Sequence, residues 1–125
     1  MKRRAILALG SNEPDDRTIV MAMQRLSAEA CLVAASPIAV TQAVGISSPP
    51  FHNAVVSLVT TASYPTLLRL TKRLEREGGD DRQHRKAGRI VLDIDILSYN
   101  GRRYHAEDWQ RDYVKRLINA QKKRK

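Results

Sequence analysis

Apolar residues along the chain recur at two spacings, and these spacings predict strands and helices in a definite order. Four short apolar runs, rich in β-branched residues, are typical of strands, at residues 5–9, 31–41, 54–60 and 89–97. Three segments repeat apolar residues every three or four positions, which is typical of amphipathic helices, at residues 15–30, 65–77 and 109–118. Two segments have neither spacing and are predicted to be loops, at residues 42–50 and 78–89.

Capping and helix-breaking residues mark the ends of these elements. Asp15 or Asp16 is expected to cap the first helix. The apolar stripe of that helix consists of Ile19, Val20, Met23, Leu26 and Ala30. Pro37 predicts an edge strand or a bulge within the second strand. Pro65 lies just inside the start of the second helix, which Gly78 and Gly79 are expected to end.

The predicted order is β-α-β-β-α-β followed by a terminal helix, which indicates an α+β fold. This split βαβ order is typical of the ferredoxin-like arrangement, a mostly antiparallel four-stranded sheet with helices on one face. The opposite face is then open to a ligand. We expect one domain over residues 1–125, with basic tails at residues 1–4 and 122–125.

Composition and charge narrow the class of protein. A single cysteine, Cys31, excludes an internal disulfide and a zinc site built from cysteines. No apolar run approaches the roughly 20 residues of a membrane helix, so we expect a cytoplasmic protein without a membrane partner. The net charge is +9, but seven positive charges lie in the basic tails. Only 5% of residues are aromatic, which is too few for an obvious base-stacking surface for nucleic acid.

Two carboxylates interrupt the apolar run of the fourth predicted strand. Side chains alternate between the faces of a strand, so Asp93 and Asp95 should share one face. The opposite face should then carry Leu92, Ile94 and Ile96. Neighbouring carboxylates repel each other, and hard oxygen ligands on one rigid element suit Mg²⁺. The alternative is an edge strand whose second face is simply wet.

The loop predicted at residues 78–89 is mostly basic. Its charged residues, on either side of Gly88, are Arg82, His84, Arg85, Lys86 and Arg89. Most runs of this kind are solvated loops. This one ends directly at the acidic strand, and cations beside a metal site would together suit a polyphosphate.

Three motifs, in this order, resemble those of the 6-hydroxymethyl-7,8-dihydropterin pyrophosphokinase family of folate biosynthesis. They are ALGSN at residues 8–12, FHNAVV at residues 51–56 and LDIDIL at residues 92–97. Their joint order and spacing is specific, and the similarity runs from about residue 5 to residue 118. The resemblance implies the ferredoxin-like fold and transfer of the β,γ-diphosphate of ATP to the pterin hydroxymethyl group, with AMP released. It also implies two Mg²⁺ ions, with ATP as co-substrate.

The resemblance assigns the acidic pair and the pterin pocket. Asp93 and Asp95 would hold the metal ions. The pterin-binding residues would be Val44, Phe51, Asn53 and Tyr113. Tyr113 stands where the family stacks a phenylalanine on the pterin, and a tyrosine ring stacks equally well. Without the resemblance, Phe51 would be read as a core residue, Asn53 as a turn residue and Tyr113 as a half-buried helix aromatic.

Nucleotide contacts and phosphate-binding cations follow from the same resemblance. Glu75, His105 and Arg111 would contact the nucleotide. The catalytic cations of the loop would be Arg82, Lys86 and Arg89. On sequence alone, Glu75 would be read as an exposed helix residue.

The chain departs from the family pattern just before the aspartate strand. Family members place a tryptophan, then glycine, proline and arginine, where this chain has residues 87–90 (AGRI). The tryptophan is therefore missing, and Ile90 occupies the usual arginine position. Arg89 or Arg85 is a candidate replacement for that arginine.

Three functions remain open, ranked in this order. The first is an active or weakly active, Mg²⁺-dependent pterin pyrophosphokinase. The second is a protein of the same fold that binds a pterin or a nucleotide without turnover. The third is an RNA-binding module, which the charge favours but the small number of aromatic residues does not. We expect ATP and hydroxymethyl-dihydropterin as small-molecule partners, no nucleic acid partner, and a monomer.

Overall fold

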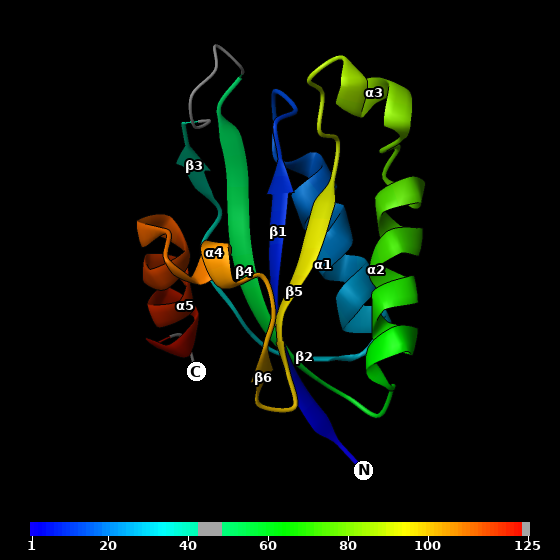
Figure 1. Cartoon of the computed structure of the whole chain (residues 1–125), viewed down its shortest axis with the longest axis vertical. Helices are drawn as coiled ribbons and strands as arrows, with labels where there is room; N and C mark the ends of the chain where they lie inside the picture. Colours follow the sequence, from blue (N-terminus) through cyan, green and yellow to red (C-terminus); the bar gives the residue numbers. More distant parts are fainter. Residues whose placement is uncertain (43–48, 124–125) are drawn as a thin grey trace.

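The computed structural model describes residues 1–42 and 49–123 (Figure 1). Within these residues the strands are β1 (Arg3–Ser11), β2 (Cys31–Ala35), β3 (Ala39–Thr41), β4 (Phe51–Thr60), β5 (Asp93–Tyr99) and β6 (Arg102–Arg103). The helices are α1 (Arg17–Glu29), α2 (Tyr64–Glu77), α3 (Arg82–Lys86), α4 (Ala106–Trp109) and α5 (Asp112–Lys123). None of these helices is long and apolar enough to cross a membrane.

The strands form one antiparallel sheet, in the order β2-β4-β1-β5-β6, and β3 also pairs with β4. The predicted α+β class is therefore confirmed. The prediction of four strands is wrong, because the described part of the sheet has six. The run at residues 31–41 is divided into β2 and β3 on either side of Pro37, where a proline was expected to disturb the strand. The turn at Asn100 and Gly101 adds the two-residue strand β6.

One face of the sheet packs against α1 and α2. Alternate residues of β1 are buried on this face, and they are Ala5, Leu7 and Leu9. The helices contribute Ile19 and Leu26 from α1 and Leu67 and Leu74 from α2. The main hydrophobic core thus lies between the sheet and these two helices.

The C-terminal helix α5 covers part of the opposite face. Val114, Leu117 and Ile118 of this helix pack with Val55 of β4 and Leu97 of β5 in a second hydrophobic cluster. Helices therefore lie on both faces of the sheet, with α1 and α2 on one and α5 on the other (Figure 1). Because α5 covers only part of this face of the sheet, the rest of the face can border a ligand site.

A β-bulge in β5 changes the alternation of its side chains. Leu7 of β1 pairs with Ile96, but Ile6 pairs with Ser98, so Leu97 is an extra residue in the ladder. Before the bulge, the odd-numbered residues of β5 face the α5 side. After it, Tyr99 lies in the main core with the even-numbered residues.

Several local predictions are corrected by the structure. Val20, which was placed on the apolar stripe of the first helix, is 39% exposed. Asp16 stands at the N-cap of α1 without a side-chain capping bond, whereas the Asp15 carboxylate accepts a hydrogen bond from the backbone N–H of Arg17. Trp109 belongs to the separate short helix α4, because the predicted last helix is interrupted before α5.

The segment before the aspartate strand also differs from its prediction. The basic segment predicted to be a loop contains the one-turn helix α3. The Asp81 side chain caps α3 by accepting a hydrogen bond from the backbone N–H of His84. The strand itself begins at Asp93 and not at Arg89, so residues 89–92 connect α3 to the sheet.

Candidate functional site

Asp93 and Asp95 lie on one face of β5, as the alternation of the strand predicts. In the ladder with β1 they pair with Gly10 and Ala8. Ile94, between them, is buried in the main core on the other face. Among the described strands, β6 joins β5 only at Ser98 and Tyr99, so both carboxylates lie where the outer edge of β5 has no strand partner. This half of β5 is therefore an edge of the described sheet, but its second face is not simply wet, because the Asp95 side chain is only 27% exposed.

Burial and the neighbouring Asp93 both act on the carboxylate of Asp95. The Asp95 side chain is 27% exposed. Burial raises the pKa of Asp95 to about 7, and the charge of Asp93 and a hydrogen bond with it act in the same direction. His105 opposes this shift in the pKa, since its Nε2 lies 3.8 Å from Asp95 Oδ1. The site therefore favours any added positive charge.

The donor set fits a hard divalent ion that arrives with a phosphate ligand. The described residues contain no group of three or more His, Cys, Asp or Glu side chains that could hold a metal ion by themselves. In polyphosphate sites, Mg²⁺ typically uses one or two carboxylates and takes its other oxygens from phosphates and water. Asp93 and Asp95, on one face of β5, can supply these one or two carboxylates.

A cleft of about 1080 Å³ lies beside the acidic pair. Its lining comes from β1, β3, β4, β5 and the C-terminal segment. The predicted site residues that line it are Phe51, Asn53, Asp93, Asp95, Arg111 and Tyr113. Residues that are more than 50 positions apart in the chain thus share one cavity.

Asn53 presents its amide from within β4 and is not a turn residue. Its side chain is almost completely buried, and Nδ2 donates a hydrogen bond of 2.6 Å to Thr41 Oγ1 of β3. A Cβ atom at Gly10 would lie 3.4 Å from Asn53 Oδ1 and 3.9 Å from Cδ2 of Phe51. The missing side chain at Gly10 therefore leaves space next to this amide and the Phe51 ring.

Tyr113 and Arg111 reach the cleft from the start of α5. Burial raises the pKa of Tyr113, and a hydrogen bond with Arg111 counteracts that change in pKa. Arg111 Nε also lies 3.5 Å from Asp108 Oδ1. Trp109 fixes this segment on the sheet, because its Nε1 donates to the backbone oxygen atoms of Leu97 and Tyr104.

Glu75 and His105 do not line the cleft. Glu75 is a residue of α2 whose side chain is directed toward β5, and it is only 6% exposed. Its interpretation as an exposed helix residue is therefore wrong. Its carboxylate accepts a hydrogen bond of 2.8 Å from the backbone N–H of Ile94, and burial raises its pKa. His105 has a positive φ of 55° at the start of α4, and its Nε2 approaches the site at Asp95 Oδ1.

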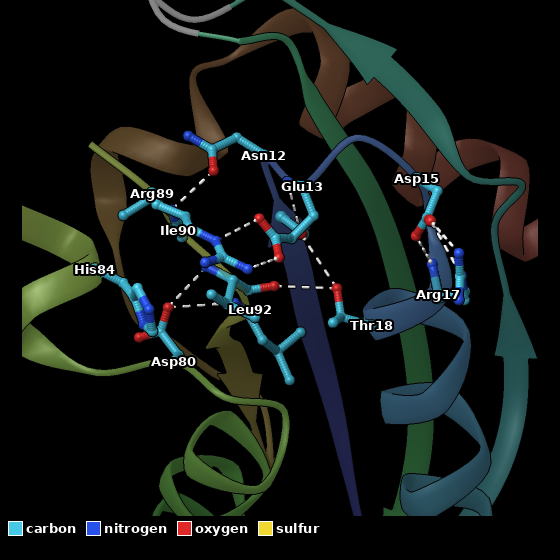
Figure 2. Close-up of polar contacts among 12 residues, drawn as sticks. Asn12, Glu13, Asp15, Arg17, Thr18, Asp80, His84, Arg89, Ile90 and Leu92 are labelled. Atoms are coloured by element: carbon cyan, nitrogen blue, oxygen red, sulfur yellow. Dashed lines mark hydrogen bonds and ion pairs between the residues drawn. The ribbon is translucent and has the colours of Figure 1, made fainter. Parts of the chain in front are cut away.

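The predicted phosphate-binding cations are not gathered at the acidic pair. Arg82 and Lys86 are exposed on α3, and neither forms an ion pair with a residue in the described part of the chain. Arg89 makes two hydrogen bonds, of 2.8 and 2.6 Å, to the carboxylate of Glu13 (Figure 2). Val44, predicted to bind the pterin, lies outside the described residues.

The segment that carries Arg89 is tied to the end of β1. Asn12 donates through Nδ2 to the backbone oxygen of Gly88 at 2.8 Å and accepts through Oδ1 from the backbone N–H of Ile90 at 2.8 Å. Thr18 Oγ1 donates to the backbone oxygen of Val91 at 3.0 Å. Figure 2 shows Asn12, from the end of β1, bonded to Ile90, and Thr18, from α1, directed at the same segment before β5.

Arg85, rather than the predicted cations, contacts the acidic pair. One of its terminal nitrogens lies 3.2 Å from Asp93 Oδ1 and 3.3 Å from the backbone oxygen of Leu92. Its Nε donates to the buried carboxylate of Asp80. The sequence offered Arg89 or Arg85 as a replacement for the missing arginine, and of these two it is Arg85 that contacts Asp93.

Comparison with known proteins identifies the family of the chain. No curated protein matched the chain. A family model described as 7,8-dihydro-6-hydroxymethylpterin-pyrophosphokinase matches residues 6–121. The match covers nearly the whole chain, including the motif at the end of β1, the start of β4, the aspartates of β5 and most of α5. The protein therefore belongs to the 7,8-dihydro-6-hydroxymethylpterin-pyrophosphokinase family.

Proposed function

We propose that the protein transfers the β,γ-diphosphate of ATP to the hydroxymethyl group of 6-hydroxymethyl-7,8-dihydropterin. The observation that carries this proposal is the shared cleft, which joins an acidic pair to an amide and two aromatic rings. In the reaction, the hydroxymethyl oxygen bonds to the β-phosphorus. The bond from that phosphorus to the oxygen bridging the α-phosphate breaks, AMP leaves, and the hydroxyl proton passes to solvent.

The residues of the cleft divide between the two substrates. Phe51 and Tyr113 would hold the flat pterin ring, and the amide of Asn53 would offer it both a donor and an acceptor. Arg111 would contact the nucleotide, because it is a cation of the cleft lining between Asp108 and Tyr113. His105 is a second candidate contact of the nucleotide, next to Asp95.

Asp93 and Asp95 would hold the divalent ions, two in number by the family pattern. Bound Mg²⁺ would neutralise phosphate charge that develops as the diphosphate moves. The contribution of the protein is to keep both carboxylates on one rigid strand, with the buried Ile94 fixing that strand on the core.

The direct test is to incubate the pure protein with ATP, Mg²⁺ and hydroxymethyl-dihydropterin and to measure AMP. We expect AMP and pterin diphosphate in equal amounts, and no AMP in EDTA or with the Asp95→Asn variant. Formation of ADP in place of AMP, or AMP that does not depend on the pterin, would exclude the proposed reaction.

A second candidate function is binding of a pterin or nucleotide with little or no turnover. It is favoured by the position of Arg89, which is held by Glu13, and by Ile90, an apolar residue in the cleft lining. Calorimetry that shows binding of both substrates without AMP formation would support this function over the first.

We also interpret β1, β2, β4 and β5 with α1 and α2 as a ferredoxin-like arrangement. The order β2-β4-β1-β5 supports it, because each of the two helical connections then links strands separated by one other strand. The additional strands β3 and β6 extend this unit, and β3 lines the cleft together with the C-terminal segment.

A further inference from the structure

The guanidinium group of Arg85 is bound by a buried carboxylate at one end and by a partly exposed carboxylate at the other. Asp80 is the anchor, and its side chain is only 5% exposed. Its Oδ1 accepts hydrogen bonds from the backbone N–H groups of Val91 and Leu92, while Oδ2 accepts from Arg85 Nε. A buried carboxylate with all these partners fixes the guanidinium group relative to the start of β5.

The far end of the same guanidinium group lies against the proposed metal site. A terminal nitrogen is 3.2 Å from Asp93 Oδ1, and the side chains of both residues are about one-third exposed. Among the described residues, no ion pair joins Arg82, Lys86 or Arg89 to Asp93 or Asp95. Arg85 is thus the loop cation in direct contact with the acidic pair.

We infer that Arg85 is an internal counter-cation of Asp93, which competes with a divalent ion in the free protein and transfers to a phosphate oxygen when the metal–nucleotide complex binds. This inference rests on the proposed function. The transfer requires only that the terminal nitrogen exchanges one oxygen acceptor for another, because the Nε bond to Asp80 can persist. Guanidinium groups form strong, planar hydrogen bonds with phosphate as well as with carboxylate.

The inference predicts changes of opposite sign in two binding equilibria. Without nucleotide, the positive charge of Arg85 disfavours a cation at Asp93, so Arg85→Gln should bind Mn²⁺ about three- to tenfold more tightly. With nucleotide, the same variant loses a phosphate contact and should bind the Mn²⁺ complex of a non-hydrolysable ATP analogue about tenfold more weakly. If the role of Arg85 were purely structural, Arg85→Gln would weaken binding of both Mn²⁺ and the Mn²⁺–analogue complex, or would change neither.

The experiment measures Mn²⁺ binding by electron paramagnetic resonance and binding of the Mn²⁺–analogue complex by calorimetry. Arg82→Gln is the matched control, because it removes a positive charge from the same helix at a residue that forms no ion pair with Asp93. We expect it to leave nucleotide-free Mn²⁺ affinity within about twofold of the original protein. Unchanged or weaker Mn²⁺ binding by Arg85→Gln would overturn the inference.

Two further variants separate the inference from the proposed function. Asp93→Asn should greatly weaken Mn²⁺ binding, and if it does not, the metal site and the inference both fail. If Asp93→Asn weakens binding but Arg85→Gln does not tighten it, only the inference fails. Should Arg85→Gln not fold, Arg85→Lys replaces it: the retained charge should keep Mn²⁺ affinity near that of the original protein while analogue binding falls. Tighter Mn²⁺ binding by Arg85→Lys would overturn the inference.

Discussion

At the scale of single residues, the site depends on polar side chains that the strands hold in fixed directions. Asn53 is an example, because β4 places it on the cleft side and Thr41 of β3 orients its amide. The short strand β3 pairs with β4 at this position, with Ala39 opposite Asn53. The amide oxygen is then directed toward the space left by Gly10.

We predict that Asn53→Ala weakens pterin binding by about 1–3 kcal/mol, because polar groups of the ligand lose their partners in a desolvated cleft. Calorimetry with the pterin measures the effect. Thr41→Val is the control, since it removes only the hydrogen bond that orients the amide and should weaken binding less. Equal pterin affinity of Asn53→Ala and the original protein would remove Asn53 from the site.

Ile90 lines the cleft where the family usually has an arginine. We predict that Ile90→Arg increases turnover by on the order of 10–100-fold, since it adds a cation where charge develops on the transferred diphosphate. Single-turnover kinetics at saturating ATP measure the effect. Arg89→Ala tests the competing expectation that Arg89 already serves the phosphates: a sharp loss of turnover in this variant, with no gain in Ile90→Arg, would contradict our prediction.

Residues whose role follows from strand alternation could be predicted from the sequence, and residues whose role depends on tertiary burial could not. Asp93 and Asp95 belong to the first kind, because a spacing of two residues places them on one face. Asp80 and Glu75 belong to the second, since each becomes buried by tertiary packing, Glu75 against β5 and Asp80 against the residues that precede β5. Arg85 acquires its position from Asp80, so the sequence could name it only as an alternative to Arg89 for the missing arginine and could not decide between the two.

At the scale of elements, the connection from α3 to β5 is held by hydrogen bonds rather than by apolar packing alone. Asn12 satisfies one backbone oxygen and one backbone N–H of this connection, and its own N–H donates to the oxygen of Ile90 at 2.9 Å. This pairing continues the direction of β1 past Ser11, although residues 88–91 are not part of a strand.

We predict that Asn12→Ala lowers the free energy of unfolding by about 1–3 kcal/mol, because two partly buried backbone groups lose their partner. Urea denaturation measures the loss, and hydrogen exchange should show less protection of the Ile90 amide. Glu13→Gln is the control: it weakens a partly exposed ion pair with Arg89 and should cost less than about 1 kcal/mol. If Glu13→Gln lost more stability than Asn12→Ala, the Glu13–Arg89 ion pair, and not Asn12, would hold this connection.

Glu75 makes the contact between α2 and β5 sensitive to pH. Burial raises the pKa of Glu75, so its protonated form is favoured in the folded state. The stabilisation from this group is fully present below the pKa of the unfolded chain and is lost as the pH rises through the raised pKa. We predict that Glu75→Gln removes this loss of stability with rising pH. The variant should be about 1 kcal/mol more stable than the original protein at pH 8.

Urea denaturation at pH 5 and pH 8 measures this prediction. Glu77→Gln is a matched control from the same helix, because Glu77 is partly exposed and forms ion pairs with Arg25 and Arg73. It should lower the stability slightly at pH 8, since it breaks those pairs. If Glu75→Gln retains the full pH dependence of the original protein, the burial of the carboxylate does not control it.

Elements with enough residues to show a period could be predicted, and the shortest ones could not. The interruption at Pro37 was expected, because proline cannot donate to the ladder of a strand. Helices α3 and α4 have five and four residues, which is too short for an apolar stripe to appear in the sequence. The apolar residues 90–92 continue the pattern of β5, but Asn12, Thr18 and Asp80 hold them outside the sheet.

At the scale of the whole molecule, the sheet separates two hydrophobic clusters that contribute differently to stability and to the cleft. The cluster under α1 and α2 holds the strands together, and the smaller one under α5 also forms a wall of the cleft. Stability and ligand binding should therefore be separable by substitutions on the two faces.

We predict that Leu117→Ala lowers the free energy of unfolding by about 2–4 kcal/mol and also weakens pterin binding, because α5 carries Tyr113. Leu67→Ala is the matched control in the other cluster. It should cause a similar loss of stability but leave pterin affinity unchanged at a temperature where both variants are folded. Urea denaturation and calorimetry measure the two effects, and equal pterin affinities of both variants would contradict the separation.

The bulge at Leu97 determines where this strand can change length in evolution. A deletion of the Leu97 codon would restore regular alternation, with Asp93, Asp95 and Tyr99 still on their present faces. A deletion of the Ile94 codon would instead make the two aspartates neighbours and direct them to opposite faces. Gains and losses of single residues in β5 should therefore be tolerated at Leu97 and selected against between the aspartates.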